Sequence, residues 1–211
     1  MSKILSETPN NDRELKMDRT VVWHPGQVMT EERAILFKQR PATVWLTGLS
    51  GAGKSTIACA LERRLLDSDH AAYVLDGDNI RHGLNRDLGF SPLDRAENIR
   101  RIAEVACLMN DAGLIVIAAF ISPYRVDREM ARSIIGSGEF LEVHVNTSIE
   151  VCEGRDPKGM YRRARAGELS DFTGISAPYE LPLEPVCSID TARYSVEECV
   201  DLLMGLLGPF L

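Results

Sequence analysis

Hydrophobic positions follow two patterns along the chain. Short continuous apolar runs predict strands that are buried on both faces of a parallel sheet. These runs lie at residues 43–47, 72–75, 114–120 and 140–145. Stretches in which apolar residues recur with a 3.6-residue period predict amphipathic helices. These stretches lie at residues 30–39, 55–66, 126–135 and 196–206.

The longest predicted helix follows Ser91. Pro92 suits the first helical position and Asp94 stands three residues after the serine, so Ser91 is the predicted N-cap. Gly113 is expected to end the helix. The apolar positions that share one face of this helix are Ile99, Ile102, Ala103, Ala106 and Met109.

The alternation of strands and helices predicts one α/β domain, in which a mainly parallel sheet lies between two layers of helices. We place this domain at residues 21–211 and expect residues 1–20 to form a flexible tail. Residues 154–174 lack apolar periodicity and are rich in basic residues and glycine. We expect a long loop there, and such a loop in a compact domain is usually functional.

Composition favours a cytoplasmic protein that binds neither nucleic acid nor membrane. The net charge is -7 and the pI about 5.2, so any anionic ligand requires a local basic site. No apolar run approaches the roughly 20 residues of a membrane span, and the polar N-terminus does not resemble a signal peptide. The five scattered cysteines suggest reduced thiols, and Cys59, Cys107 and Cys199 are expected to be buried.

Residues 48–55 (GLSGAGKS) match G-x-x-x-x-G-K-[ST], the pattern of a phosphate-binding loop. They follow a predicted strand and begin a predicted helix, as the pattern requires. Lys54 would reach the β- and γ-phosphates of a nucleotide, and Ser55 would hold Mg²⁺. The alternative is a glycine-rich turn with a surface lysine. The predicted ATP-binding residues are Gly48, Leu49, Ser50, Gly51, Ala52, Gly53, Lys54, Ser55 and Thr56.

Two carboxylates, Asp76 and Asp78, follow the second predicted strand. Ligands of open α/β sheets bind at the carboxyl ends of the strands. A carboxylate there can position an acceptor hydroxyl, accept its proton or bind magnesium through water. A simple Asp-Gly turn would explain Asp76 but not the second aspartate, and we favour Asp78 as the functional residue.

Four further motifs occur in order along the chain. They are LDGDNIRHGLNRDLGFSPLDRAENIRRIAEVA at 75–106, FISPYR at 120–125, RDPKGMYRRARAGE at 155–168 and FTGISAPYE at 172–180. Together they resemble the adenylylsulfate kinases (APS kinases) of the bacterial, stand-alone type. The likeness extends from about residue 21 to the C-terminus.

The resemblance implies a P-loop nucleotide-kinase-like fold with a basic lid loop, and a homodimer. The implied reaction transfers the γ-phosphate of ATP, with Mg²⁺, to the 3′-hydroxyl of adenylyl sulfate (APS). The products are ADP and 3′-phosphoadenylyl sulfate, and the pathway is sulfate assimilation, with a functional link to ATP sulfurylase.

The resemblance also implies site residues. Arginines there can bind phosphate and sulfate oxygens, and Phe90 and Phe172 can clamp the adenine. Taken alone, Arg95 and Asn98 would more simply form a solvated helix face, and Phe90 would pack in the core. The implied APS-binding residues are Asp78, Arg81, Phe90, Arg95, Asn98, Ile121, Ser122 and Phe172, and the implied catalytic residues are Ser122, Asp78 and Lys54.

Ser122 matches the serine that is designated as a phosphoserine intermediate in bacterial relatives. Direct transfer from ATP needs no covalent step. The alternatives are that Ser122 binds substrate or is the N-cap of the helix after Pro123. Arg125 and Asp127 are expected to form salt bridges nearby.

The basic stretch matches the lid of the family, which would close over ATP and exclude water. The lid residues are Arg155, Lys158, Arg162, Arg163 and Arg165. Two other functions stay open: a P-loop kinase for another acceptor, and an ATP-binding module without turnover. The absence of an N-K-x-D motif argues against a GTPase.

Overall fold

The computed structural model describes Val22, His24 and residues 26–211. The tail predicted for residues 1–20 lies outside this part of the chain. Within the described residues, five parallel strands form a single sheet in the order β2-β3-β1-β4-β5. The strands are β1 (Ala42–Thr47), β2 (Ala72–Asp76), β3 (Ile115–Ala119), β4 (Phe140–Val145) and β5 (Cys187–Ile189). The parallel sheet confirms the predicted fold class.

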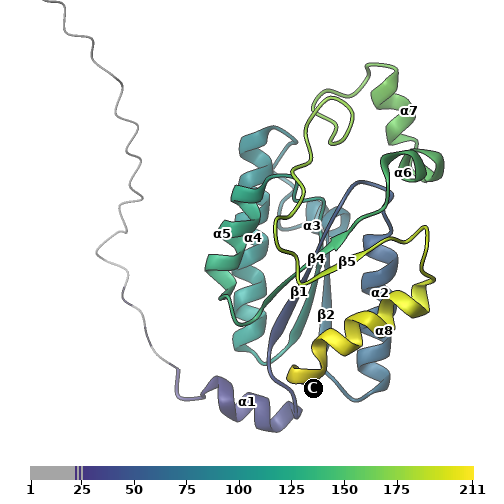
Figure 1. Cartoon of the computed structure of the whole chain (residues 1–211). Coiled ribbons are helices and arrows are strands. Elements are labelled where there is room, and N and C mark those ends of the chain that lie inside the picture. The colour runs from purple at the N-terminus through teal and green to yellow at the C-terminus, as the bar shows by residue number, and fades with distance from the viewer. Residues whose placement is uncertain (1–21, 23, 25) are drawn as a thin grey trace, which may run out of the picture.

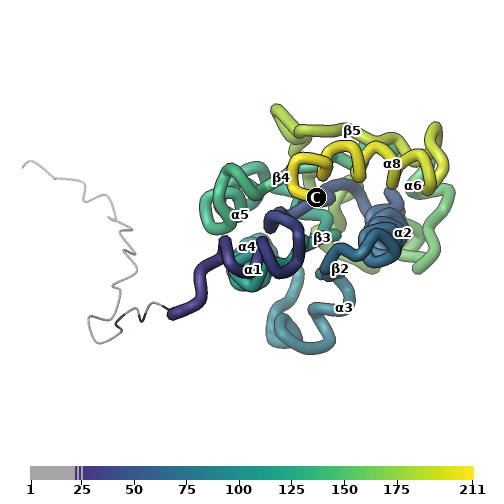
Figure 2. The backbone as a smooth tube through the Cα atoms, turned by 90° about the horizontal axis from the view of Figure 1, so that it is seen from below, coloured from purple at the N-terminus to yellow at the C-terminus, as the bar shows by residue number. Residues whose placement is uncertain are grey.

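Helices cover both faces of the sheet, which gives three layers (Figures 1 and 2). Helices α2 and α8 pack on one face, and α4 and α5 pack on the other. The helices are α1 (Thr30–Phe37), α2 (Lys54–Asp67), α3 (Gly77–His82), α4 (Pro92–Asp111), α5 (Arg125–Ile135), α6 (Ile149–Arg155), α7 (Met160–Arg165) and α8 (Val196–Leu207), followed by a 3₁₀ turn at Gly208–Phe210.

The central strand β1 contributes to two separate hydrophobic cores. Val44 and Leu46 belong to the core shared with α2 and α8, whereas Trp45 belongs to the core shared with α4 and α5. All six residues of the strand are buried, as its continuous apolar pattern predicts. Each such aliphatic side chain stabilises the fold by about 1.5–3 kcal/mol on burial.

The structure confirms the start of α4 in detail. The Ser91 side chain accepts a hydrogen bond from the backbone N–H of Asp94, and Pro92 is the first helical residue. The four short elements α3, α6, α7 and β5 were not predicted. Residues 154–174 contain helix α7 rather than only the expected loop. Of the three cysteines expected to be buried, Cys199 is buried, Cys107 is only partly buried and Cys59 is exposed.

None of the helices in the described residues combines the length and apolar character that crossing a bilayer requires.

Candidate functional site

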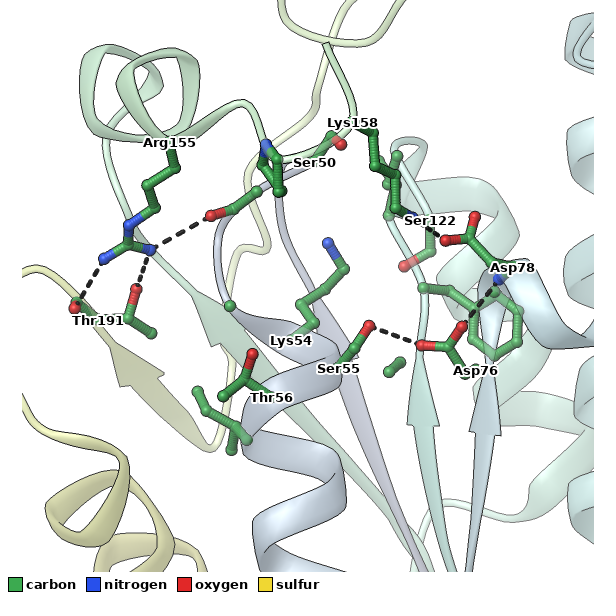
Figure 3. A pocket seen from close by; sticks show the side chains of 18 of the residues that line it. Ser50, Lys54, Ser55, Thr56, Asp76, Asp78, Ser122, Arg155, Lys158 and Thr191 are labelled. Carbon is green, nitrogen blue, oxygen red and sulfur yellow. Dashed lines mark hydrogen bonds and ion pairs between the residues drawn. The ribbon is translucent and has the colours of Figure 1, made fainter. Parts of the chain in front are cut away.

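A cavity of about 590 Å³ lies at the carboxyl ends of β1, β2 and β3, where ligands of parallel sheets bind. Lys54 stands in its middle (Figure 3). Arg155, Thr191 and Thr56 lie on one side of Lys54, and we call this side the donor arm. Asp76, Asp78 and Ser122 lie on the other side, which we call the acceptor arm. We assign to the same arm the cavity residues of α3, of α4 with the segment before it, and of the loop before α5, which are Arg81, Phe90, Arg95, Asn98 and Ile121.

The predicted phosphate-binding loop connects β1 to α2. Gly48 has a φ of +154°, and a Cβ there would lie 2.5 Å from the carbonyl oxygen of Val145. Gly53 has a φ of +100° and directly precedes the first helical residue, Lys54. Only glycine suits these positions, so the backbone turns sharply and the positive end of the α2 dipole faces the cavity.

Lys54 is buried, and its ammonium donates hydrogen bonds to the carbonyl oxygens of Gly48 at 2.9 Å and Leu49 at 2.7 Å. Loss of water around the ammonium lowers its pKa to about 8, although the nearby Cys152 and Asp76 oppose the shift. A surface lysine, the alternative interpretation of the sequence, is therefore wrong. A buried ammonium at the centre of the cavity can bind a phosphate strongly.

Asp76 lies against the phosphate-binding loop. The Ser55 hydroxyl donates to Asp76 Oδ2 at 2.6 Å. The other carboxylate oxygen, Oδ1, accepts from the backbone N–H of Asp78 and of Asn79, so Asp76 is the N-cap of α3. The sequence alone favoured Asp78 and gave no sign of this contact. Ser55 and Asp76 are 21 positions apart in the sequence, and only the pairing of the parallel strands brings them together.

Asp78 forms an ion pair with Lys158, which extends from the segment after α6 (Figure 3). Both side chains are more than half exposed, at 63% and 60%. An ion pair with this exposure contributes about 0–1 kcal/mol. Asp78 is therefore accessible to a ligand that enters the acceptor arm.

The acceptor arm contains two half-buried arginines beside an exposed aromatic ring. The guanidinium carbon of Arg81 lies 4.4 Å from the centre of the Phe90 ring, and that of Arg95 lies 5.8 Å from it. Their hydrogen bonds go to backbone carbonyls, and neither forms an ion pair with another described residue. Two partly desolvated cations without a carboxylate favour binding of an anion.

The alternatives for two acceptor residues are wrong. Phe90 is 58% exposed, so it does not pack in the core, and Asn98 is buried rather than on a solvated helix face. The Asn98 carbonyl oxygen accepts from the Asn85 side chain at 3.0 Å. This bond leaves the amide N–H₂ of Asn98 as the group that can donate to a ligand.

Ser122 lies at the cavity but is not the N-cap of α5, because that cap is Tyr124. It is buried, and its hydroxyl accepts from the indole N–H of Trp45 at 3.2 Å.

The salt bridges expected for Arg125 and Asp127 do not form among the described residues. Arg125 Nε donates to the carbonyl of Leu181, and burial raises the pKa of Asp127.

Phe172 does not line the cavity in this structure. It is buried in the core and meets the ring of Tyr161 edge-on, with the ring centres 5.0 Å apart. The carbonyl of its neighbour Asp171 accepts from Arg95 at 2.9 Å. The segment thus contacts the acceptor arm through its backbone, while the aromatic ring points elsewhere.

The predicted lid residues divide into two groups. Arg155 and Lys158 line the cavity. Arg163 pairs with Glu168 and Arg165 pairs with Glu153, away from the cavity lining, and Arg162 also lies outside that lining. Position along the basic stretch, rather than charge alone, therefore decides which side chains face the site.

The donor arm contains Thr191, which the sequence did not indicate as a site residue. Thr191 donates from its hydroxyl to the carbonyl of Ala52 at 2.8 Å and accepts from Arg155 at 2.7 Å, so it joins the phosphate-binding loop to the lid. Tyr194 also lines the cavity. Both residues follow β5, and recognition of that three-residue strand would have placed them at the carboxyl edge of the sheet.

Known proteins resemble this chain over almost its whole length. Residues 40–190 match the family described as adenylylsulphate kinase. An adenylyl-sulfate kinase of Vibrio vulnificus is 58% identical over 198 residues, which is 91% of this chain and 96% of the relative. One of Vibrio cholerae is 60% identical over 180 residues, covering 85% and 84%.

A solved structure of an APS kinase is also similar to this chain. An APS kinase of Mycobacterium tuberculosis, in complex with AMPPNP and APS, superposes with a TM-score of 0.78 and 48% identity. The superposition covers 81% of this chain and 99% of that one. The family match spans the phosphate-binding loop, the acceptor arm and the lid.

Proposed function

The chain belongs to the adenylylsulfate kinase family, and on that premise we propose that it transfers the γ-phosphate of ATP to the 3′-hydroxyl of adenylyl sulfate. The products are ADP and 3′-phosphoadenylyl sulfate, and the reaction serves sulfate assimilation. The observation that carries this proposal is the cavity with an arm on each side of Lys54. Phosphoryl transfer depends mainly on holding donor and acceptor in line.

The donor arm binds ATP. The backbone N–H groups of residues 48–56 surround the triphosphate, and the ammonium of Lys54 contacts the β- and γ-phosphates. The nucleoside lies toward Arg155, Thr191 and Tyr194, which line the cavity.

The acceptor arm binds adenylyl sulfate. Arg81 and Arg95 supply charge for the phosphate and sulfate oxygens, Phe90 offers an exposed ring to the adenine, and the Asn98 amide donates a hydrogen bond. Ile121 contributes apolar surface to the cavity. Phe172 would need to turn out of the core to complete an aromatic clamp.

A magnesium ion fits beside the phosphate-binding loop. The Ser55 hydroxyl and the Asp76 carboxylate meet at 2.6 Å, and both are oxygen ligands of the kind that Mg²⁺ prefers. Such an ion is commonly held by one or two protein groups together with waters and phosphates. When bound, it supplies positive charge to the phosphate oxygens.

The residues of the chain then perform separate parts of the transfer. Asp78 accepts a hydrogen bond from the 3′-hydroxyl and takes its proton as the phosphoryl group arrives. Lys54 stabilises the charge on the transferring group. Arg155 and Lys158, at the cavity rim, exclude water when the lid closes.

Ser122 acts by holding the loop of residues 120–124, which we call the acceptor loop, rather than as a phosphorylated intermediate. Its burial and its hydrogen bond to Trp45 support this assignment. With labelled ATP alone, no label should remain on the protein. Label on Ser122 that transfers to added adenylyl sulfate would demonstrate the covalent route.

An acceptor panel tests the proposed function. The chain is mixed with MgATP and, separately, adenylyl sulfate, AMP and small alcohols, and ADP is measured. We expect turnover with adenylyl sulfate and with none of the other acceptors. Turnover with AMP but not adenylyl sulfate would identify a kinase for another acceptor, and tight ATP binding without turnover would identify a regulatory module.

Assembly and location complete the proposal. The family resemblance supports a homodimer, which light scattering on a sizing column would detect. Five free cysteines support a reducing, cytoplasmic location. A functional link to ATP sulfurylase, which would supply the acceptor, can be tested by coupling the two activities in one assay.

A further inference from the structure

Arg128 connects three segments of the fold that are distant in sequence. It lies in α5 and is only 2% exposed. Its Nε donates to Glu142 Oε1 on β4 at 2.6 Å, one terminal nitrogen donates to the carbonyl of Ser122 at 2.7 Å, and the other donates to the carbonyl of Glu180 at 2.8 Å. A planar guanidinium can make three such bonds at once, whereas the compact ammonium of lysine cannot reach all three.

The first of the two carbonyls belongs to a residue with an unusual backbone conformation. Ser122 has a φ of +39°, in the left-handed region that residues other than glycine seldom adopt. Such a conformation persists only where the surroundings fix it. Here the carbonyl accepts from Arg128, and the side chain is held by Trp45.

The second carbonyl belongs to Glu180, which lies in the segment of residues 169–186 that leads from the predicted lid to β5. We call it the return segment. The backbone N–H of Glu180 donates to the carbonyl of Pro123 at 2.8 Å, and its carboxylate accepts from the N–H of Arg125 at 2.7 Å. Tyr179 places its ring beside the Arg128 guanidinium and its hydroxyl 2.9 Å from Thr47, the last residue of β1. The return segment is therefore fastened to the acceptor loop and to the start of the phosphate-binding loop.

We propose that Arg128 is a positioning residue for the acceptor: it holds the Ser122 loop in its left-handed conformation and fixes the return segment of the lid against that loop. Glu142 keeps the guanidinium oriented by balancing its charge. The inference rests on the proposed binding of adenylyl sulfate in the acceptor arm. Changing Arg128 should therefore impair the kinetics with adenylyl sulfate far more than the kinetics with ATP, although Arg128 does not line the cavity.

The structure offers a matched control. Arg132 also pairs with Glu142, at 3.2 Å, but makes no hydrogen bond to Ser122 or Glu180. Arg128→Lys and Arg132→Lys both keep the charge near Glu142, and only the first loses the forked contact with the two carbonyls. We compare kcat and KM for each substrate, together with the unfolding temperature.

We expect Arg128→Lys to lower kcat/KM for adenylyl sulfate by about 10–100-fold, the cost of a misplaced reactant, with the KM for ATP within about twofold of the native value. Arg132→Lys should leave both values within about twofold. Equal acceptor defects in the two variants, or equal changes in both KM values of Arg128→Lys, would overturn the proposal.

A second variant tests the proposal if Arg128→Lys fails to fold. Arg128→Met with Glu142→Gln removes both buried charges together, which folded proteins tolerate better than one unpaired charge. It should show the same acceptor defect, and normal acceptor kinetics would also overturn the proposal. Arg81→Ala, measured in parallel, separates the two hypotheses: if it raises the acceptor KM and Arg128→Lys does not, only the role of Arg128 is wrong. If neither raises it, the acceptor arm itself is wrongly assigned.

Discussion

The phosphate-binding loop, which contains Lys54, and the acceptor arm both line the cavity, but they are built differently. The loop is one run of residues whose backbone N–H groups we propose as donors to the phosphates, and its glycines are required because a Cβ at Gly48 would collide with Val145. The acceptor arm collects side chains from α3, α4 and the loop before α5. A backbone site tolerates few changes of conformation, whereas a side-chain site can change its ligand through single substitutions.

Removal of the Lys54 ammonium tests the first half of this comparison most severely. Lys54→Ala should lower kcat by about 10³-fold, because one preorganised donor to a developing charge is worth 10²–10³ and Lys54 also carries full charge. Single-turnover kinetics with saturating substrates would measure it. A kcat within tenfold of the native value, in a variant with a normal unfolding temperature, would refute the role of Lys54.

The acceptor arm should respond in KM rather than in ATP binding. Arg95→Ala should raise the KM for adenylyl sulfate by about 10–100-fold, since a hydrogen bond to a charged group contributes about 1.5–3 kcal/mol. ATP affinity, measured by calorimetry, should stay within about twofold. Arg163→Ala is the control, because that arginine pairs with Glu168 away from the cavity. A similar KM in the two variants would contradict the two-arm description.

The two arms should also differ in pH dependence. Burial lowers the pKa of Lys54 to about 8, so the ammonium loses its proton as the pH rises through that value. The triphosphate prefers the charged form, so ATP affinity should fall above pH 8, by at most about tenfold per pH unit. Nucleotide titrations from pH 7 to 9.5 would measure this, with Lys54→Arg as the control that does not titrate. Constant affinity across the range would show that Lys54 remains charged.

The smallest effect is expected for the ion pair between Lys158 of the predicted lid and Asp78 of the acceptor arm. Lys158→Ala should change the free energy of unfolding by less than about 1 kcal/mol, because both it and Asp78 are mostly exposed. Urea denaturation, compared with Arg165→Ala in the lid, would measure the difference. A loss of several kcal/mol would mean that this contact holds the Lys158 segment against the acceptor arm.

The sequence predicted the long, periodic elements well and the short ones poorly. Strand β1 and helix α4 are recognisable because burial on both faces and a proline-containing cap leave clear local patterns. Helices α3, α6 and α7 have six or seven residues, and β5 has three, so each is too short to show a period.

The same distinction holds within the site. The phosphate-binding loop could be recognised from eight consecutive residues, because its chemistry is local. The contact of Ser55 with Asp76 and the three-way bonding of Arg128 arise only when the chain folds. Phe172 shows the limit of a family motif: its neighbours in sequence match, yet its ring packs against Tyr161.

The central position of β1 has a consequence for hydrogen exchange. Its backbone is paired with β3 on one side and β4 on the other, and all six of its residues are buried. Amides in such a strand exchange mainly through global unfolding, while surface segments open locally at much lower cost. We therefore expect the amides of β1 to exchange slowly, which gives the phosphate-binding loop a rigid base even when surface segments open.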